Sequence, residues 1–149
     1  MKEKLKDFQA EDLYGKKRSL KDFQGENLYL VFNRGFIWPF CRRHMDQLRD
    51  HKEEFEKKNI RILVFGPENN EDFRKYWEKN KMPFIGFPDA KKIMKEYGQE
   101  SKWYKLGRMP FQIAADSEGN VIEKHWGQSM KDIPDIEDVL SLYSDKGKS

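Results

Sequence analysis

Short runs of apolar residues alternate along this chain with longer, densely charged segments. Two of the runs, Leu28–Phe32 and Ile60–Phe65, have the length and the branched or aromatic residues of buried β-strands. Between them, Met45, Leu48 and Phe55 recur at helical spacing within a charged segment. The pattern predicts one amphipathic helix between two strands, and hence a parallel strand pair with a right-handed crossover.

The rest of the chain predicts three more helices and a β-hairpin. The first of these helices follows an Asn70 cap, the second ends at Gly98 and the third can start at Pro134. Their apolar residues are Phe73, Tyr76 and Trp77; Ala90, Ile93, Met94 and Tyr97; and Ile136, Val139, Leu140 and Tyr143. Phe111–Ala115 and Val121–Ile122, joined by a polar turn, predict the hairpin. This order indicates an α/β domain with a central mixed β-sheet flanked by helices on both faces, an order that several folds share.

The composition is that of one globular domain. Of the 149 residues, 37% are hydrophobic and 14% are aromatic, enough for a sizeable core without disulfides or metals. The 29 basic and 26 acidic residues interleave, as in Lys52–Lys58, which is typical of solvated helix faces rather than of a nucleic-acid-binding surface. We therefore expect a single domain over residues 1–149, with 145–149 as a frayed tail, and no nucleic-acid partner.

Cys41 is the only cysteine, so no disulfide can form within the chain. The first residues, Met1–Lys6, lack the apolar run of a secretory signal, and every apolar run is much shorter than a membrane span. From these features we expect a cytoplasmic protein with no membrane partner.

The same cysteine is the strongest candidate for chemistry, because it lies between the end of the first predicted strand and the helix that follows. Unpaired N–H groups and the helix dipole at a helix start stabilise a thiolate, which is the reactive form of cysteine. Arg34, Arg42 and Arg43 lie nearby and could lower the thiol pKa further if their side chains turn toward the sulfur. The alternative is that Cys41 is a small buried hydrophobic residue without chemistry.

A set of short motifs extends over most of the chain: Asp7-Phe8, Gly15, Ser19-Leu20, Asp22-Phe23, Met82-Pro83-Phe84, Phe87-Pro88-Asp89, Lys92-Ile93, Tyr97-Gly98, Phe111–Asp116, Gly119 and Val121. These motifs resemble those of the peroxiredoxins of the alkyl hydroperoxide reductase and thiol-specific antioxidant family, particularly the bacterioferritin comigratory proteins. The resemblance implies a thioredoxin-like fold.

The family motif P-x-x-x-T-x-x-C, placed without gaps, falls on Arg34, Trp38 and Cys41. The resemblance therefore implies that Cys41 is the peroxidatic cysteine, although the proline and threonine of the motif are replaced. In a second register, residues 34–41 resemble the R-G-x-W-C-P-F-C signature of peroxiredoxin-like proteins, with Trp38 in place of the first cysteine. Because no second sulfur exists, dithiol thioredoxin or isomerase activity is not expected.

The resemblance implies a one-cysteine thiol peroxidase that acts on hydrogen peroxide or organic hydroperoxides. Cys41 would become a sulfenic acid and be recycled by an external thiol, either a thioredoxin-like protein or a small thiol, because Asp46 stands where relatives often keep a resolving cysteine. Arg108 or Arg34 would polarise the peroxide and hold the thiolate. The walls of the pocket would be Trp38, Pro39, Phe40 and Pro110. No cofactor is implied, and the chain is expected to act alone or as a homodimer.

Two further expectations concern proline and histidine. Pro110 stands where thioredoxins carry a cis-proline facing the cysteine, and we expect the cis form here as well. The three histidines, His44, His51 and His125, show no metal-ligand pattern, so we expect no metal site and place them in solvent or at the edge of the core.

Two other functions fit the same sequence. A thioredoxin-fold binding or adaptor domain that has lost catalysis would account for the replaced motif residues, Arg34 and Trp38. A redox sensor would instead use Cys41 to form an intermolecular disulfide under oxidation.

Overall fold

The central element of the structure is a five-stranded mixed sheet. This computed structural model describes residues 3–99, 101–102, 107–129 and 131–143. The strands are β3 (Asn27–Phe32), β4 (Ile60–Phe65), β5 (Ile85–Phe87), β8 (Phe111–Ala115) and β9 (Val121–Trp126), in the spatial order β5-β4-β3-β8-β9. The first three are parallel to one another, whereas β8 runs antiparallel to both of its neighbours.

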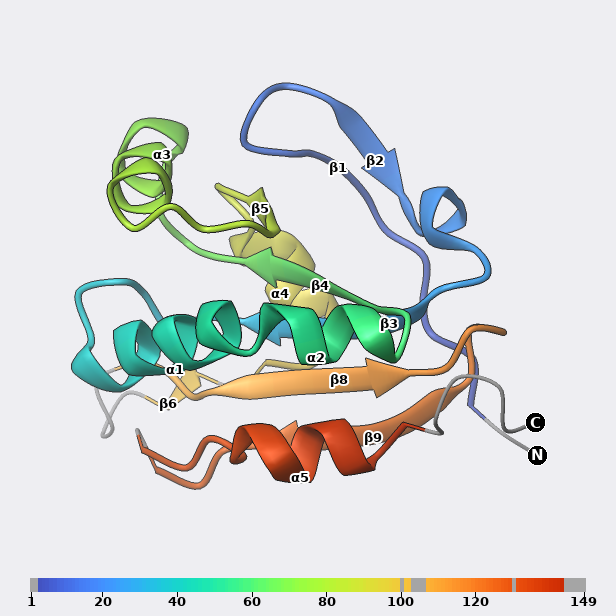
Figure 1. The fold of residues 1–149 in the computed structure, drawn as a ribbon. Coiled ribbons are helices and arrows are strands. Elements are labelled where there is room, and N and C mark those ends of the chain that lie inside the picture. The colour runs from blue at the N-terminus through green and yellow to red at the C-terminus, as the bar shows by residue number, and fades with distance from the viewer. Residues whose placement is uncertain (1–2, 100, 103–106, 130, 144–149) are drawn as a thin grey trace.

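Helices cover both faces of this sheet, as the sequence predicts. One face carries α1 (Pro39–Asp50), α2 (Lys52–Lys57), α3 (Asn70–Lys79) and α5 (Ile136–Ser141), and the other carries α4 (Lys91–Tyr97). Figure 1 shows α1 and α2 running along the front of the sheet, with α4 behind it. Outside the sheet lie β1 (Gln9–Glu11), β2 (Lys17–Ser19), the short 3-10 helix η1 (Leu20–Phe23), β6 (Ser101–Lys102) and β7 (Gly107–Arg108).

Two hydrophobic clusters, one on each face of the sheet, hold these layers together. Met45, Leu48 and Phe55 bury their side chains in the first cluster, and Phe32 and Phe65 stack in the second with ring centroids 5.2 Å apart. Each such side chain contributes about 1.5–3 kcal/mol when it is fully buried. Because the two central parallel strands are covered on both faces, they read in the sequence as continuous apolar runs.

The structure confirms most predicted elements and corrects three details. The single helix predicted after Cys41 is two helices, because the backbone leaves helical geometry at His51 (φ −107°, ψ 16°). The cap of α3 is Asn69 rather than Asn70, and its side chain accepts a hydrogen bond from the backbone of Asp72 at 2.8 Å. The last helix begins at Ile136, after Asp135 as its cap.

Among the residues that the structure describes, no helix is long and apolar enough to cross a membrane. The predicted frayed tail, 145–149, lies outside the described residues.

Candidate active site

Cys41 lies in the first turn of α1, at the end of the loop that leaves β3. Trp38 is the helix cap and Pro39 is the first helical residue, so Cys41 is the third. The fixed φ angle of proline suits the first position of a helix, where its missing N–H has no partner to lose. The predicted placement at a helix start is therefore confirmed, but only 4% of the cysteine is exposed.

The ionisation state of the thiol differs from the sequence-based expectation. Burial raises the pKa of the Cys41 thiol above its ordinary value, because a thiolate loses its hydration inside the protein. The backbone amides of Arg34 and Gly35 and the charge of Arg34 lower this pKa, whereas the charge of Glu68 raises it. Desolvation has the largest effect, so the net shift of the pKa is upward, although the charge of Arg34 acts in the expected direction.

Of the three arginines near Cys41, only Arg34 acts on its sulfur. Arg34 is 4% exposed, its guanidinium carbon lies 4.3 Å from the centre of the half-buried Trp38 ring, and burial lowers its own pKa. Arg42 instead donates hydrogen bonds to two carbonyl oxygens of the preceding loop at 3.0 and 2.9 Å. Arg43 is exposed and, together with Phe40, lines a cleft beside α1.

The loop between β3 and α1 is held in place by side chains that the sequence analysis did not single out. Glu68 Oε2 accepts a hydrogen bond from the Phe36 backbone N–H at 2.6 Å, and Asn33 Oδ1 accepts one from the Gly35 N–H at 3.2 Å. The ring of Phe36 stacks on Tyr76 with centroids 4.2 Å apart and planes 7° apart. These contacts fix the backbone amides that act on the sulfur.

Glu68 could have been found from the strand pattern alone. It lies three residues after the end of β4, β4 is parallel to β3, and Phe32 pairs with Phe65 at the ends of the two strands. Since parallel strands leave a sheet at the same edge, the loop after β4 had to lie beside the loop that leads to Cys41.

The predicted pocket residues Pro39, Phe40 and Pro110 differ in their exposure. Pro39 is exposed, and Phe40, which is 38% exposed, lines a cleft between α1 and the segment before α5. Pro110 is buried and directly precedes β8, whose Phe111 pairs with Phe32 at the end of β3.

The bond before Pro110 is not cis, because the described residues include no cis peptide bond. The backbone just before Pro110 is instead held by hydrogen bonds from a glutamine side chain. Gln99 Nε2 donates hydrogen bonds to the carbonyl oxygens of Phe32 and Met109 at 3.1 and 3.0 Å, which ties the strand end that leads to the cysteine to the turn before β8. The backbone of Arg108 belongs to β7, but its side chain lies outside the described part of the structure.

His44 differs from the expectation of a solvated or core-edge histidine. It lies three residues after Cys41 on α1 and is only 3% exposed. Burial lowers its pKa to about 4, so its ring is neutral at neutral pH. Within the described residues, no group of three or more His, Cys, Asp or Glu side chains is placed to hold a metal ion.

Comparisons with known proteins agree with this fold. The sequence profile described as Redoxin matches residues 1–140. The crystal structure of peroxidoxin BcpB from Mycobacterium tuberculosis is similar, with a TM-score of 0.80, 18% identity, and coverage of 95% of this chain and 94% of that one. Reduced 2-Cys peroxiredoxin from Plasmodium vivax also gives a TM-score of 0.80, with 15% identity and coverage of 94% of this chain and 78% of that one.

No curated protein sequence matches the chain significantly. The two structural similarities, at under one fifth identity, concern the fold, which is the thioredoxin-like fold of peroxiredoxins. The family follows from the profile, which spans nearly the whole chain and includes the loop and helix that carry Cys41. The chain therefore belongs to the redoxin family.

Proposed function

We propose that this protein is a one-cysteine thiol peroxidase that reduces hydrogen peroxide or organic hydroperoxides through Cys41. The observation that carries the proposal is that the backbone amides of Arg34 and Gly35 and the charge of Arg34 all favour the thiolate of Cys41. Such donors stabilise a thiolate, and they would also stabilise the negative charge that develops on a peroxide oxygen.

In the proposed reaction the Cys41 thiol first gives its proton to water. The thiolate then attacks one peroxide oxygen in line with the O–O bond, so that an S–O bond forms as the O–O bond breaks. Sulfur is oxidised by two electrons to the sulfenic acid, and the peroxide is reduced by two electrons. The departing oxygen takes up a proton from water and leaves as water or an alcohol, which balances the proton released at the start.

Arg34 is the proposed electrostatic partner in this step, with Trp38 stacked on it in place of the threonine of the family motif. The stack holds the guanidinium against the residue that caps α1, so its position costs little reorganisation during the reaction. Arg108 remains a second proposed partner on the strength of its position in the sequence.

Because Cys41 is buried, only a small fraction of the protein carries its thiol in the ionised, accessible form that reacts. The 4% exposure and the raised pKa keep most of the thiol protonated and shielded at neutral pH. Reaction therefore requires an opening of the loop that leads to α1, and we expect peroxide reduction to be slow compared with an enzyme whose thiol is already ionised.

Recycling must use a thiol from outside, because the chain has only one cysteine. The external thiol condenses with the sulfenic acid to a mixed disulfide and water. A second thiol then releases Cys41 as a thiol together with an oxidised disulfide of the reductant.

The test is peroxide consumption by the purified protein with excess dithiothreitol, together with mass spectrometry after dimedone treatment. We expect turnover and a dimedone adduct on Cys41, and we expect both to vanish in Cys41→Ser. Cys41→Ser is a near-isosteric change at a buried position, and circular dichroism checks that the variant folds. A protein that forms no adduct and consumes no peroxide would contradict the proposal.

The second candidate, a thioredoxin-fold binding domain without catalysis, is favoured by the burial of Cys41 and its raised pKa. It predicts a thiol that alkylates only at high pH and forms no sulfenic acid with excess peroxide. The dimedone experiment therefore separates the two functions.

A further inference from the structure

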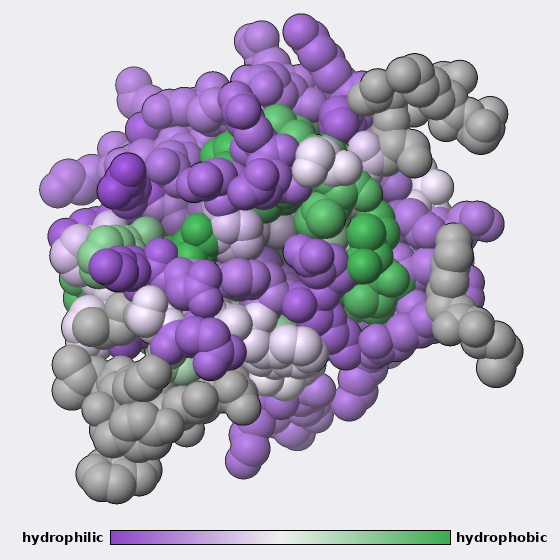
Figure 2. Space-filling model, turned by 90° about the horizontal axis from the view of Figure 1, so that it is seen from below, coloured by the Kyte–Doolittle hydropathy of each residue, from purple (hydrophilic) through white to green (hydrophobic). Residues whose placement is uncertain are grey.

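Asn33 is a polar side chain inside a protein whose polar residues lie mostly on the outside. Figure 2 shows one face of the molecule as mainly hydrophilic, with small, separate hydrophobic patches. Asn33 is instead only 3% exposed. It is the first residue after β3 and begins the loop, with Arg34 and Gly35, that leads to Cys41. The proposed peroxidase chemistry gives its side chain no role.

The backbone of Asn33 is fixed by the sheet. Its N–H donates to the carbonyl oxygen of Phe65 at 2.9 Å, so it continues the pairing between β3 and β4. Side chains alternate between the two faces of a sheet along a strand. Val31, two residues earlier, packs in the hydrophobic cluster that contains Met45 of α1. Asn33 therefore lies on the face of the sheet that is covered by the helix with Cys41.

One side of the Asn33 carboxamide is bound to the cysteine loop. Oδ1 accepts a hydrogen bond from the Gly35 N–H at 3.2 Å, which distinguishes the oxygen of the carboxamide from its nitrogen. The Gly35 N–H also forms a hydrogen bond to Cys41 that favours the thiolate. Asn33 Oδ1 and the Cys41 sulfur therefore share one donor, and this places the carboxamide beside the sulfur.

The other side of the carboxamide is unpaired. Nδ2 is buried and has no hydrogen-bond partner among the residues that the structure describes. Buried donors are normally paired, and an unpaired donor raises the free energy of the state in which it occurs. The reduced protein therefore has an unused hydrogen-bond donor next to its only sulfur.

Oxidation of Cys41 would supply an acceptor for this donor. A sulfenic acid carries one oxygen on the sulfur, and that oxygen accepts hydrogen bonds. Because it is attached to a buried residue, it meets Nδ2 inside the protein once the loop has closed again, so Nδ2 needs no path to solvent. A chain without a second cysteine must also keep its sulfenic acid until an external thiol arrives.

We propose that Asn33 takes part in the reaction of Cys41 by donating a hydrogen bond from Nδ2 to the oxygen of the sulfenic acid. The bond exists in the oxidised protein and not in the reduced one, so it stabilises the oxidised form. Decay of the sulfenic acid requires the loop to open, which breaks the bond, so the bond prolongs the life of the sulfenic acid. This inference rests on the proposed function, since the sulfenic acid forms only if Cys41 reacts with a peroxide.

Two variants separate the oxygen of Asn33 from its nitrogen. Asn33→Leu removes both polar atoms at similar volume, whereas Asn33→Asp keeps an acceptor for the Gly35 N–H and loses the donor. In the reduced protein the pH profile of Cys41 alkylation should move to lower pH in Asn33→Leu, because the sulfur no longer shares the Gly35 N–H. It should move to higher pH in Asn33→Asp, because an anion opposes the thiolate. That upward shift also shows that the introduced carboxyl is ionised and cannot donate.

In the oxidised protein the two variants should instead behave alike. One equivalent of hydrogen peroxide is added, the excess is removed, and the remaining sulfenic acid is trapped with dimedone at intervals and quantified by mass spectrometry. We expect its half-life to fall about fivefold in both variants, which corresponds to about 1 kcal/mol, the net contribution of a typical hydrogen bond. Asn27, at the opposite end of β3, donates from Nδ2 to the Lys58 carbonyl oxygen. Asn27→Leu is the matched control and should leave the half-life unchanged.

A direct measurement follows the side-chain amide of Asn33 by NMR, with its signals identified by their absence from Asn33→Leu. On oxidation, one of the two amide protons should shift downfield and exchange more slowly with solvent. An amide that does not shift would overturn the inference, as would half-lives that neither variant shortens. A half-life that falls in Asn33→Asp alone would also overturn it, because the introduced charge would be the cause.

These outcomes remain distinct from a failure of the proposed function. If the unaltered chain forms no dimedone adduct, the proposed function fails and the inference fails with it. If the adduct forms normally and the half-lives and the Asn33 amide do not change, the inference alone fails.

Discussion

The side chain of Glu68 accepts a hydrogen bond from the backbone N–H of Phe36, with 2.6 Å between Oε2 and the nitrogen. This bond joins the loop after β4 to the loop that leads to Cys41. The same carboxylate lies close to Gly35, where an added Cβ would be 3.2 Å from Oε2. Glu68 therefore combines two effects on the site, because it orders the loop whose amides act on the sulfur and adds a negative charge that opposes the thiolate.

Replacing Glu68 with glutamine separates these effects. Glu68→Gln keeps an oxygen that accepts the Phe36 N–H but removes the charge, so the pKa of the Cys41 thiol should fall. The rate of iodoacetamide alkylation at neutral pH should rise several-fold, with the pH profile displaced to lower pH. The exposed Glu71→Gln on α3 is the control. A profile that does not move would show that the charge of Glu68 has no effect on the sulfur.

Arg34 acts in the opposite direction. Arg34→Met removes the cation that favours the thiolate while keeping a long apolar stem against Trp38, so the alkylation profile should move to higher pH and peroxide reduction should slow at least about tenfold. Exposed Arg61, which pairs with Glu26, provides the comparison variant Arg61→Met. If Arg34→Met reacted with peroxide as fast as the unaltered chain, the guanidinium would have no part in the chemistry.

Buried His44 should make the stability of the fold sensitive to acid. Its folded-state pKa of about 4 lies below the ordinary value of 6.5, so between these pH values the unfolded chain binds a proton that the folded chain excludes. Stability should fall as the pH drops through this window, by about 3 kcal/mol in total at the lower end.

Urea unfolding between pH 4 and pH 7 measures this effect. The non-titrating variant His44→Leu should lose less stability on acidification than the unaltered chain. His51→Gln, at the half-buried turn between α1 and α2, should follow the unaltered chain. Parallel pH dependences of the His44→Leu and unaltered proteins would show that His44 is not the titrating group.

Tyr29 offers a stability prediction away from the site. The residue is 2% exposed and its hydroxyl has no hydrogen-bond partner among the described residues, while its ring stacks on Phe55 at 6.3 Å. Tyr29→Phe removes a buried polar atom and keeps the ring, so the variant should be as stable as the unaltered chain or more stable by about 1 kcal/mol. Thermal unfolding by circular dichroism checks this, and a clear loss of stability would mean that the hydroxyl has a bonded partner.

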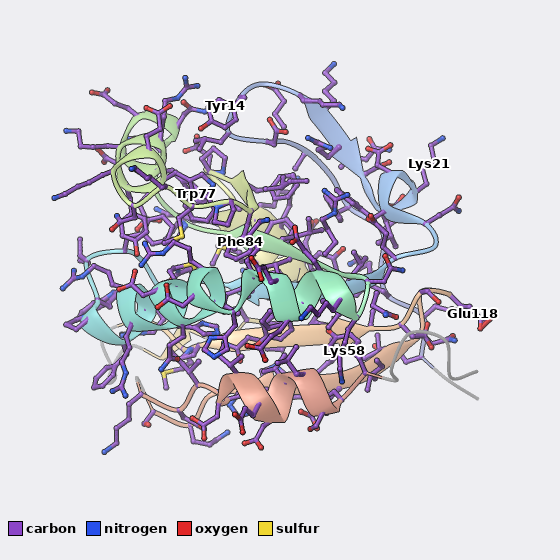
Figure 3. All side chains as sticks on the ribbon, viewed as in Figure 1. Tyr14, Lys21, Lys58, Trp77, Phe84 and Glu118 are labelled. Atoms are coloured by element: carbon purple, nitrogen blue, oxygen red, sulfur yellow. The ribbon has the colours of Figure 1, made fainter. Side chains whose placement is uncertain are left out.

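The deep aromatic packing near the site bears on how such variants should be chosen. Figure 3 shows Trp77 on the side of α3 that faces the rest of the domain, where its indole N–H donates to the carbonyl oxygen of Phe84 at 2.9 Å. Phe73, one turn earlier, packs against Phe36 of the cysteine loop. Truncation of either residue would disturb both core and loop, so the polar substitutions above give a cleaner measure of chemistry.

Much of the fold follows from the sequence because its signals are local. The two continuous apolar runs predict β3 and β4 closely, and Gly98, with φ of 111°, ends α4 as its position indicates. The break at His51 has no such signal, since no proline or glycine stands there and only tertiary packing decides it. The short strand β5 is only three residues long, too short for a clear periodic pattern.

The site was predictable in position but not in electrostatics. A strand followed by a helix places Cys41 at the helix start from sequence alone, whereas its burial depends on how the preceding loop folds over it. The three arginines near Cys41 are equivalent in the sequence, but only Arg34 affects the sulfur, because Arg42 is bonded to loop carbonyls and Arg43 is exposed.

The parallel alignment of β3 and β4 has a consequence for evolution of the site. Phe32 pairs with Phe65 at the ends of β3 and β4. Glu68 therefore meets the loop that leads to Cys41 because these two interior strands end at the same edge of the sheet. A slip of two residues between these strands would preserve which side chains point inward, yet it would carry Glu68 roughly 7 Å along the sheet and away from Phe36. The register of the two strands therefore contributes to the pKa of the Cys41 thiol. Substitutions in the sheet interior that shift this register would change the reactivity of the thiol without altering any residue beside it.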